Sequence, residues 1–540
     1  MAFAPEPDTF AGQWTRAVVA HGDRTFLRFE SPSSEVFEWT YAEFDDVVSR
    51  VATNLRMRGV GRDRGVQLAL TNSPAFVLTW LATVRLGSYV VPSDPMSTAP
   101  ELAEHLGRTS IAVLVAAEER SAVAQAAVGE HGGAADLVLV DEAEAVPEPL
   151  VRNGGLCARN KAWPCPRPAQ TAAIMFTSGT TGRPKGVVIT QANYAFAGST
   201  MAAASGLTVD DRQLVVLPMF HANAQYYSFA SAIAVGAGVA LMHTFSASGF
   251  VAQAARHRAT HASLFAGPMR MILARGSRPS EAIRRDLVLR HCWYAQNITG
   301  EQYETLADWL GCRPRQLYGM TETIPAVLTD EAVAPRPDAM GYVTDGCIVD
   351  VQDADGSSCG PDEVGEIVVG GEPGRTLFAS YLDDPATTAA SFRDGWFLTG
   401  DRARRDAEGR FFFDGRRSDV LKVAGENVSV VEVETVIADH DDVFDVVVVG
   451  APDEIRDEVP VAYVVARPAV DTESLTDRLG EWCAARLGKA KRPRSFTLVD
   501  ELPRTSVGKV RKFLLVEAAA GQTSTIISHS PQSPRTESPA

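Results

Sequence analysis

Short apolar segments of strand length alternate with helix-length segments through the first part of the chain. Strands are predicted at 66–70 and 88–92, and residues 74–86 between them are predicted to form a helix. The apolar runs 112–116 and 135–140 continue this rhythm. Alternation of this kind is typical of parallel sheets whose strands are connected by helices. The sequence therefore predicts an α/β fold.

A smaller α+β unit is predicted after a polar, glycine-containing turn at 414–419. A helix is expected at 430–438, strands at 444–449 and 461–466, and a last helix at 472–487. A length of 540 residues is enough for several domains, at roughly 100–200 residues each. We place a large N-terminal domain of parallel and mixed sheets at 1–415, a hinge approach at 416–418 and a small domain at 419–518. The Ser/Thr/Pro-rich residues 519–540 are predicted to be disordered.

Charge and cysteine usage narrow the class of protein. The formal net charge is −16, which argues against a nucleic-acid partner because such proteins show a basic footprint. The seven cysteines are scattered and lack a C-x-x-C spacing, which favours free thiols over disulfides or zinc. The acidic, proline-broken N-terminus is not a signal peptide, and the longest apolar stretch, 232–242, is too short to span a bilayer. We therefore expect a cytoplasmic protein without a membrane partner, as a monomer or homodimer.

The most informative segment is Thr177-Ser-Gly-Thr-Thr-Gly-Arg-Pro-Lys-Gly186, which follows the apolar strand 171–176. Its inner glycines let backbone N–H groups turn toward an anion, its hydroxyls add donors, and its lysine adds positive charge. The residues concerned are Thr177, Ser178, Gly179, Thr180, Thr181, Gly182 and Lys185. The segment is not a Walker A loop, because Gly-Lys-Ser/Thr is missing. Composition alone leaves a solvated turn as an equal alternative to a phosphate loop.

This loop resembles the phosphate loop of the adenylate-forming (AMP-binding) superfamily, which includes acyl-CoA synthetases, adenylation domains of nonribosomal peptide synthetases, and luciferases. Five further motifs of that superfamily follow in the same order, at 318–323, 365–370, 396–401, 414–422 and 503–509. The resemblance extends from about Thr25 to Leu515. Within the superfamily the chain resembles the carnitine/crotonobetaine–CoA ligase branch, on residues 320–324, 425–432 and 455–458. The resemblance implies a large N-terminal domain and a mobile C-terminal one.

The resemblance also implies a reaction, in which an acid oxygen attacks the α-phosphate of ATP and pyrophosphate leaves. Such a step depends on positioning and charge neutralisation. The loop 177–186 would hold the β- and γ-phosphates with Lys185 as counter-charge, and Glu322 would be the Mg²⁺ ligand. Thr321 would contact the α-phosphate, and Tyr318 would offer a flat face to adenine. For Glu322 the structural alternative is a carboxylate that offsets a helix dipole.

Four more positions receive roles from the same resemblance. Asp401 and Arg416 would bind the ribose, and Lys509 would bridge the attacking carboxylate and the α-phosphate. Asp419 occupies the hinge position, where a few residues absorb the backbone change of a domain rotation. That rotation would bring the segment from Lys422 to Gly425 to the path by which the thiol of CoA reaches the adenylate.

The acid is expected to bind beside His221, in a pocket that includes Asn223 and Gln225. For His221 the alternative is a core histidine bonded to backbone. The run 293–297 stands where many relatives carry Gly-Ala-x-Pro, so Gln296 and Asn297 alter the pocket wall. Amide side chains at these positions indicate a partly polar pocket, because polar lining residues fix a ligand's polar groups.

We therefore predict a ligase that adenylates a small carboxylic acid and transfers it to CoA, with ATP and Mg²⁺ as cofactors. One alternative is a diazotase of secondary metabolism, which adenylates nitrite and passes it to an aromatic amine. Another is a non-catalytic nucleotide-binding protein, which the presence of Lys185, Glu322 and Lys509 argues against. We interpret His257 and His261 as structural, and the G-x-S-x-G match at 356–360 as chance, because it lies in an Asp/Gly-rich turn.

Overall fold

The structure is a computed structural model that describes residues 8–152, 163, 165–177, 184–416, 420–423, 426–453, 456–468, 470–504 and 510–519. The chain divides into two compact units. The first unit holds the described residues up to Thr399 together with Arg404–Phe412, and the second holds Gly400–Ala403 and the described residues from Phe413 onward. The strands that cross this division are β20 (Trp396–Arg405) and β21 (Phe411–Arg416).

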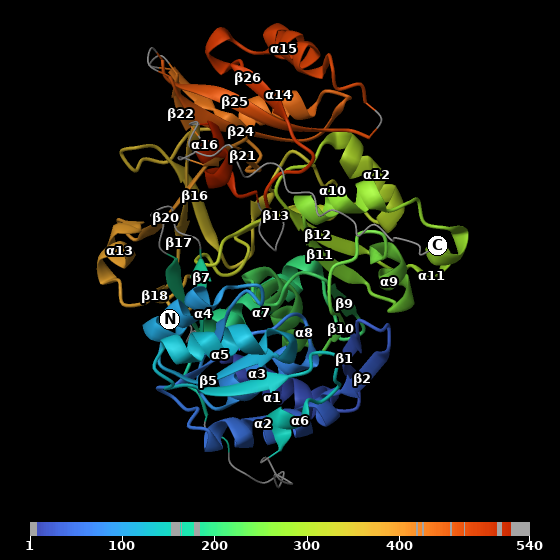
Figure 1. Ribbon diagram of the computed structural model, residues 1–540, viewed down its shortest axis with the longest axis vertical. Helices are drawn as coiled ribbons and strands as arrows, with labels where there is room; N and C mark the ends of the chain where they lie inside the picture. Colours follow the sequence, from blue (N-terminus) through green and yellow to red (C-terminus); the bar gives the residue numbers. More distant parts are fainter. Residues whose placement is uncertain are drawn as a thin grey trace, which may run out of the picture. The chain divides into compact units, whose positions relative to one another are not determined.

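The largest sheet of the first unit has nine strands within the described ranges (Figure 1). In spatial order they are β15 (Tyr342–Val343), β14 (Leu328–Thr329), β13 (Arg315–Tyr318), β12 (His291–Ala295), β11 (His261–Phe265), β9 (Arg212–Val215), β10 (Gly238–Met242), β1 (Thr25–Glu30) and β2 (Val36–Thr40). From β13 to β1 neighbouring strands pair in parallel. One face packs against α9 (Phe250–Arg256), α10 (Ala266–Arg275) and α12 (Gly300–Leu310), with α11 (Glu281–Asp286) beside α9.

A second sheet of seven strands, counted over the same described ranges, contains the strand before the glycine-rich loop. In spatial order its strands are β18 (Ser380–Tyr381), β8 (Lys185–Thr190), β7 (Thr171–Thr177), β4 (Val90–Pro92), β3 (Gly65–Ala69), β5 (Ile111–Ala117) and β6 (Asp136–Val140). Apolar residues of α4 (Ala99–Arg108) and α5 (Ser121–Glu130) join the core on one of its faces. The short helices η1 (Glu118–Arg120) and α6 (Glu148–Val151) lie in its connections.

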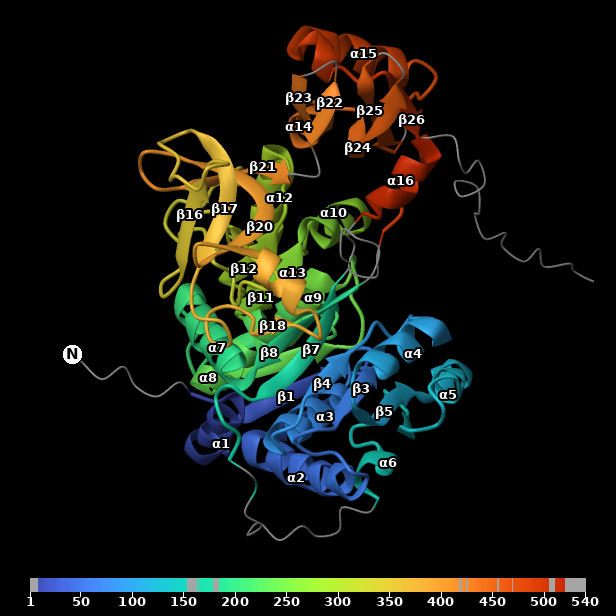
Figure 2. The same ribbon diagram turned by 90° about the vertical axis from the view of Figure 1, so that its left-hand side faces the viewer.

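A layer of helices lies between these two sheets (Figure 2). It comprises α1 (Phe10–His21), α2 (Tyr41–Met57), α3 (Pro74–Arg85), α7 (Gln191–Ser205), η2 (Asn223–Ala230) and α8 (Ser231–Val235). Stacked and edge-on aromatic rings hold it together, with Trp80 in contact with Phe10, Tyr194 and Phe229. The helix η2 has wide, π-type turns and touches both sheets. Its Tyr227 carbonyl accepts a bond from Gln213 of β9, and its Tyr226 hydroxyl lies 3.9 Å from the sulfur of Met175 in β7.

A third sheet, of five strands in the described part, runs in the order β16 (Ile348–Gln352), β17 (Val364–Gly370), β20 and β19 (Phe392–Arg393), with β21 paired to β20. The helix α13 (Pro385–Ala390) precedes β19. The second unit contains β22 (Val420–Val423), β23 (Glu426–Ser429), β24 (Val443–Asp453), β25 (Asp457–Ala466) and β26 (Ser495–Leu498), with α14 (Val430–Ala438), α15 (Leu475–Arg486), η4 (Lys489–Lys491) and α16 (Lys512–Ala519). Apolar residues of α14, α15 and this sheet form its core.

The α/β fold, with a large first unit and a smaller α+β second unit, is confirmed. The strands and helices predicted in the first part of the chain all form, and α14 has the predicted limits. Three details were wrong. Residues 414–416 are the end of β21 rather than a turn, α15 begins three residues later than predicted, and Ala519 closes α16 rather than opening a disordered tail. In each case pairing or packing decides a boundary that local composition leaves open.

No helix in the described part of the chain has both the length and the apolarity that crossing a bilayer requires.

Candidate active site

The predicted nucleotide motifs follow the carboxyl ends of strands in both large sheets. β7 ends at Thr177 and β13 ends at Tyr318, and each strand has a parallel neighbour in its sheet. Ligands of open α/β sheets bind at this edge. Thr177 pairs with Lys185 across the β7–β8 hairpin, so the two ends of the glycine-rich loop are held side by side. Ser178, Gly179, Thr180, Thr181 and Gly182 lie outside the described residues.

The loop after β13 is fixed by Thr323, which is buried. Its Oγ1 accepts a bond from the Met320 amide over 3.0 Å and donates to the Pro325 carbonyl over 3.2 Å. Gly319 lets this loop approach η2 closely, because a Cβ there would stand 2.9 Å from Ala326 Cα and 3.0 Å from the Tyr227 hydroxyl. The loop thus holds Thr321 partly exposed, while Glu322 is only 5% exposed.

A residue that the sequence motifs did not single out connects Glu322 to Lys185. The Tyr381 hydroxyl donates to Glu322 Oε1 over 3.0 Å, and Lys185 Nζ lies 4.7 Å from the centroid of the Tyr381 ring. A backbone hydrogen bond also joins the two segments, because the Phe378 amide donates to the Glu322 carbonyl over 2.9 Å. Tyr381 belongs to β18, which pairs with β8, while Glu322 follows β13 of the other sheet. No local sequence pattern predicts a contact between segments so far apart in the chain.

A cavity of about 540 Å³ lies against this group. Lys185 and Tyr381 line it, together with Arg108 of α4 and the carboxylates of Asp383 and Asp384. Arg108 is engaged, since it donates to the Pro184 carbonyl over 2.6 Å and lies over the Phe176 ring. The cavity size is within the range of small-molecule sites, roughly 300–1,000 Å³.

The two residues predicted to bind ribose are brought together in the second unit. Arg416 Nε lies 2.8 Å from Asp401 Oδ1, with Asp401 in the middle of β20 and Arg416 at the end of β21. The Asp401 side chain is 5% exposed and that of Arg416 is 44% exposed. In this ion pair the arginine faces solvent and the carboxylate is buried beneath it. Asp419, Gly425 and Lys509 lie outside the described residues, and the side chain of Lys422 in β22 is not described.

The predicted acid-pocket residues differ sharply in their surroundings. Gln225 is fully buried, and both ends of its amide are bonded within the fold, to the Tyr194 hydroxyl over 2.5 Å and the Met219 carbonyl over 2.6 Å. Asn223 is 5% exposed, and neither atom of its amide has a hydrogen-bond partner among the residues that the structure describes. Buried polar groups are normally paired, and within the described ranges Asn223 is the one side chain with two buried polar atoms left unpaired.

His221 and the end of β12 complete this region. The ring of His221 is partly exposed and packs 4.2 Å from the Phe220 ring. Gln296 and Asn297 are exposed immediately after β12, and Gln296 has φ of +74°. A side chain in this left-handed region is uncommon outside glycine, and such conformations concentrate at functional sites.

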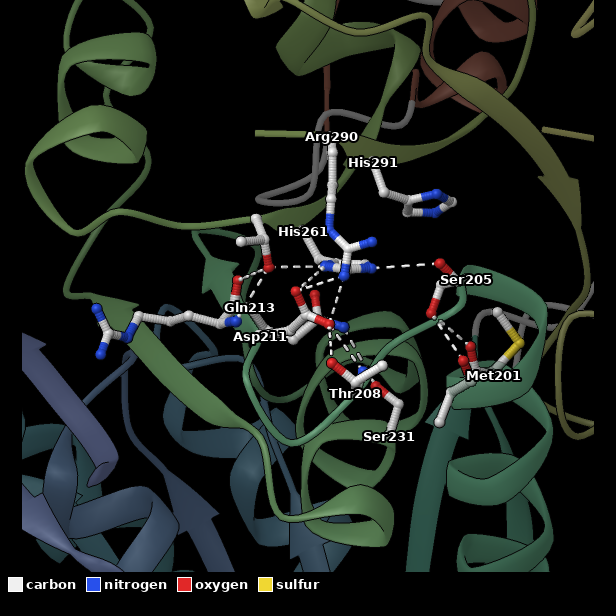
Figure 3. Close-up of polar contacts among 12 residues, drawn as sticks. Met201, Ser205, Thr208, Asp211, Gln213, Ser231, His261, Arg290 and His291 are labelled. Carbon is white, nitrogen blue, oxygen red and sulfur yellow. Dashed lines mark hydrogen bonds and ion pairs between the residues drawn. The ribbon is translucent and has the colours of Figure 1, made fainter. Parts of the chain in front are cut away.

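The histidines interpreted as structural lie at the opposite edge of the nine-stranded sheet, near the start of β11. Figure 3 shows the ring of His261 beside Asp211 and Arg290, with Ser205 on its other side. Its Nδ1 lies 2.8 Å from the Thr260 hydroxyl and its Nε2 lies 3.3 Å from the Ser205 carbonyl. His257 contacts Glu30 over 2.6 Å. Both rings are buried, and their contacts are all internal.

The buried state of His261 predicts a pH dependence of stability. Burial lowers its pKa to about 4, and the opposing charge of Asp211 does not compensate. Between about pH 6.5 and pH 4 the histidine therefore takes up a proton in the unfolded chain but stays neutral in the folded protein. Protonation then favours the unfolded state, so the free energy of unfolding should fall as the pH falls through this range. We expect His261→Gln to make that fall shallower by up to about 1.4 kcal/mol per pH unit, measured by urea denaturation.

A matched control uses the partly exposed His131, which lies in the turn after α5. His131→Gln should leave the slope unchanged. Equal slopes in the wild type and His261→Gln would contradict this account of the buried histidine.

Glu322 has the chemistry to hold a magnesium ion together with ATP. Its carboxylate is buried, oriented by Tyr381 and close to the cavity, and Mg²⁺ takes one or two carboxylates plus phosphate oxygens rather than a complete protein cage. No cluster of three or more His, Cys, Asp or Glu side chains in the described ranges could hold a metal by itself.

Comparisons with known proteins cover nearly the whole chain. Residues 14–382 match the model of the AMP-binding enzyme family, and residues 432–509 match the AMP-binding enzyme C-terminal domain. The chain is 31% identical over 507 residues to crotonobetaine/carnitine–CoA ligase of Salmonella paratyphi C, covering 92% of this chain and 97% of that protein. The same enzyme of Citrobacter koseri matches at the same identity and coverage.

Solved structures show the same fold. An anthranilate CoA ligase in complex with anthranoyl-AMP superposes with a TM-score of 0.85 at 23% identity, over 96% of this chain and 98% of that one. O-succinylbenzoate coenzyme A synthetase from Bacillus subtilis, in complex with AMP, gives a TM-score of 0.79 at 27% identity, over 93% of this chain and 97% of that one.

Proposed function

The chain belongs to the AMP-binding enzyme family, and from this we propose that it is an ATP-dependent ligase that joins a small polar carboxylic acid to CoA. The acid is first adenylated with release of pyrophosphate, and the acyl group then passes to the CoA thiol. The contact series Lys185–Tyr381–Glu322 carries the proposal, because it joins an ammonium and a carboxylate through one tyrosine, next to the loops that follow β7 and β13.

The first step needs charges arranged before ATP arrives. Lys185 would neutralise the β- and γ-phosphates together with the backbone of the loop 178–182, and Thr321 would contact the α-phosphate. Glu322 would hold Mg²⁺, which supplies further neutralisation of the phosphate charge. Tyr318 would flank adenine, while the Asp401–Arg416 pair would bind the ribose. Preorganised charge of this kind is the main source of catalysis in phosphoryl-group chemistry.

The second step requires a different arrangement of the small domain. We propose that Lys509 serves adenylation, that the chain turns at Asp419, and that the segment from Lys422 to Gly425 then lines the path of CoA. The domain limits of 1–415 and 419–518 belong to the same proposal. A mobile domain explains how one cavity could serve two reactions, since a hinge of few residues can absorb the rotation.

The acid is proposed to be small and polar because of Asn223. Leaving a buried amide without partners costs free energy that folding alone does not recover. Asn223 and Tyr227 are four residues apart on η2, whose turns are wider than those of an α-helix, so they lie on nearly the same face of it. Tyr227 reaches Gly319, so this face points at the loop that holds Thr321 and Glu322. We therefore assign Asn223 to the acid, beside His221, Gln296 and Asn297; the proposed pocket excludes Gln225.

Replacing Asn223 with leucine should make the protein more stable and the enzyme less active. The variant should raise the free energy of unfolding by about 1–2 kcal/mol, because it removes an unpaired buried amide. It should also lower kcat/KM for a hydroxylated acid such as 4-hydroxybutyrate at least about tenfold relative to butyrate. Gln225→Leu is the matched control and should destabilise the fold, because both ends of that amide are bonded. Lower stability in Asn223→Leu would remove the residue from the pocket.

The function itself is tested by ATP–pyrophosphate exchange over a panel of small, hydroxylated and aryl acids, followed by detection of acyl-CoA. We expect exchange with one class of acid and a CoA thioester with AMP as products. An incubation with ATP, Mg²⁺, nitrite and an aminohydroxybenzoate, without CoA, tests the diazotase alternative. A diazo product there, with no acid active in exchange, would overturn the ligase assignment.

A further inference from the structure

Tyr381 contacts both charged groups that we assign to the phosphates of ATP. Its hydroxyl bonds to Glu322 over 3.0 Å and the face of its ring lies 4.7 Å from the Lys185 ammonium. A cation over an aromatic face and a phenol on a carboxylate are both favourable contacts, and they gain strength where water is excluded. Tyr381 is only 6% exposed.

The position of Tyr381 is fixed from several directions. Its backbone pairs with Val187 of β8, so it moves with the strand that begins at Lys185. Its amide donates to the Thr388 hydroxyl over 2.9 Å, and its ring packs 4.8 Å from the Phe378 ring, which is fully buried. A side chain fixed in this way can hold the neighbouring charged group in position with the precision that catalysis needs.

The Tyr381 hydroxyl donates its proton to one oxygen of the Glu322 carboxylate. A donor on one carboxylate oxygen sets the orientation of the group and tunes how it binds a cation.

We propose that Tyr381 is a positioning residue for adenylation. Its hydroxyl orients the Glu322 carboxylate for the cation that accompanies ATP, and its ring holds the Lys185 ammonium beside the cavity until the phosphates arrive. The proposal rests on the function proposed above, and it assigns Tyr381 no contact with the reacting atoms.

Two substitutions separate the two contacts. Tyr381→Phe keeps the ring and removes the hydroxyl, so it should weaken the cation site while leaving the lysine in place. We expect an apparent Mg²⁺ activation constant about 10–100-fold higher in ATP–pyrophosphate exchange, with little change in the KM for ATP at saturating Mg²⁺. Tyr381→Leu removes both contacts and should raise the KM for ATP as well. Thioester formation from preformed acyl-adenylate and CoA should be unaffected in both variants.

A binding measurement makes the test independent of the acid and of the acceptor. Mn²⁺ binding to the full-length protein with a non-hydrolysable ATP analogue, followed by electron paramagnetic resonance, needs neither substrate. Tyr381→Phe should bind Mn²⁺ about tenfold more weakly than the wild type, as loss of a group that orients a metal ligand does elsewhere. If the wild type binds Mn²⁺ with the analogue but converts no acid, the proposed function fails, and the Mn²⁺ affinity of Tyr381→Phe alone then decides whether Tyr381 orients the cation ligand.

Tyr303→Phe is the matched control. Tyr303 lies in α12, and this substitution removes another buried tyrosine hydroxyl. That hydroxyl donates to the Pro314 carbonyl over 2.9 Å. The substitution should lower the melting temperature without changing Mn²⁺ binding. If Tyr381→Phe behaves in the same way, with unchanged Mn²⁺ affinity and an unchanged Mg²⁺ activation constant, Tyr381 only stabilises the fold and the inference is overturned.

Discussion

Lys509→Ala should slow ATP–pyrophosphate exchange by about 1,000-fold or more, because it removes a positive charge placed against the transition state. The residue ends the motif 503–509, whose match to the adenylate-forming superfamily supplies its role. Transfer of the acyl group from preformed adenylate to CoA should change less than about threefold, since the small domain would have rotated the lysine away. Rapid-mixing assays of the two half-reactions measure both quantities.

Lys512, three residues further on, provides the control. It begins α16 and its ammonium lies 3.2 Å from Glu434, so it serves the fold of the second unit. Lys512→Ala should leave both half-reactions close to wild type. If Lys509→Ala slowed the two half-reactions equally, one arrangement of the domains would suffice and the two-state account would be wrong.

Glu322→Gln should have the next largest effect. The amide keeps the shape of the side chain and can still accept the bond from Tyr381, but it lacks the charge that a magnesium ion requires. We expect exchange to fall at least about 100-fold at 1 mM Mg²⁺, with part of the loss recovered at higher Mg²⁺. The KM for the acid should change little, because the residue belongs to the phosphate side of the site.

Glu363→Gln separates this effect from a general loss of negative charge. Glu363 is exposed and caps the Gly360 amide over 2.8 Å, in the turn before β17. Its substitution should leave exchange and Mg²⁺ dependence unchanged. A Glu322→Gln enzyme with full activity at low Mg²⁺ would show that the carboxylate only stabilises the loop after β13.

The residues expected to bind the nucleotide could be located in the sequence because they lie in short contiguous motifs. A strand followed by glycines, hydroxyls and Lys185 is compatible with anion binding, and the resemblance to the adenylate-forming superfamily favoured that interpretation over a solvated turn. Asp401 and Arg416 were assigned to the same ribose from two separate motifs, and the structure places them 2.8 Å apart. Strand and helix order is similarly local, since apolar periodicity predicts each element before any of them pack.

Two of the residues expected to line the acid pocket differ in their surroundings in a way that the sequence does not show. Asn223 and Gln225 are two residues apart and chemically similar, and the sequence placed both in the pocket. The fold separates them, because the wide turns of η2 direct the Gln225 amide to Tyr194 and Met219 and leave the Asn223 amide buried without partners. Which amide is bonded depends on the packing of η2 against Tyr194 of α7 and against the Met219 carbonyl, six residues before Gln225, and residue type alone does not specify that packing.

By itself, the sequence determined the α/β class, the smaller second unit and the order of the nucleotide motifs, since each depends on residues close together in the chain. Only the tertiary structure decided that Tyr381 stands between Lys185 and Glu322. Pairing of β18 with β8 brings residues 185 and 381 together, and the bond to Glu322 connects the edges of two different sheets. Contacts between segments so far apart are set by packing and strand register, which local propensity does not specify.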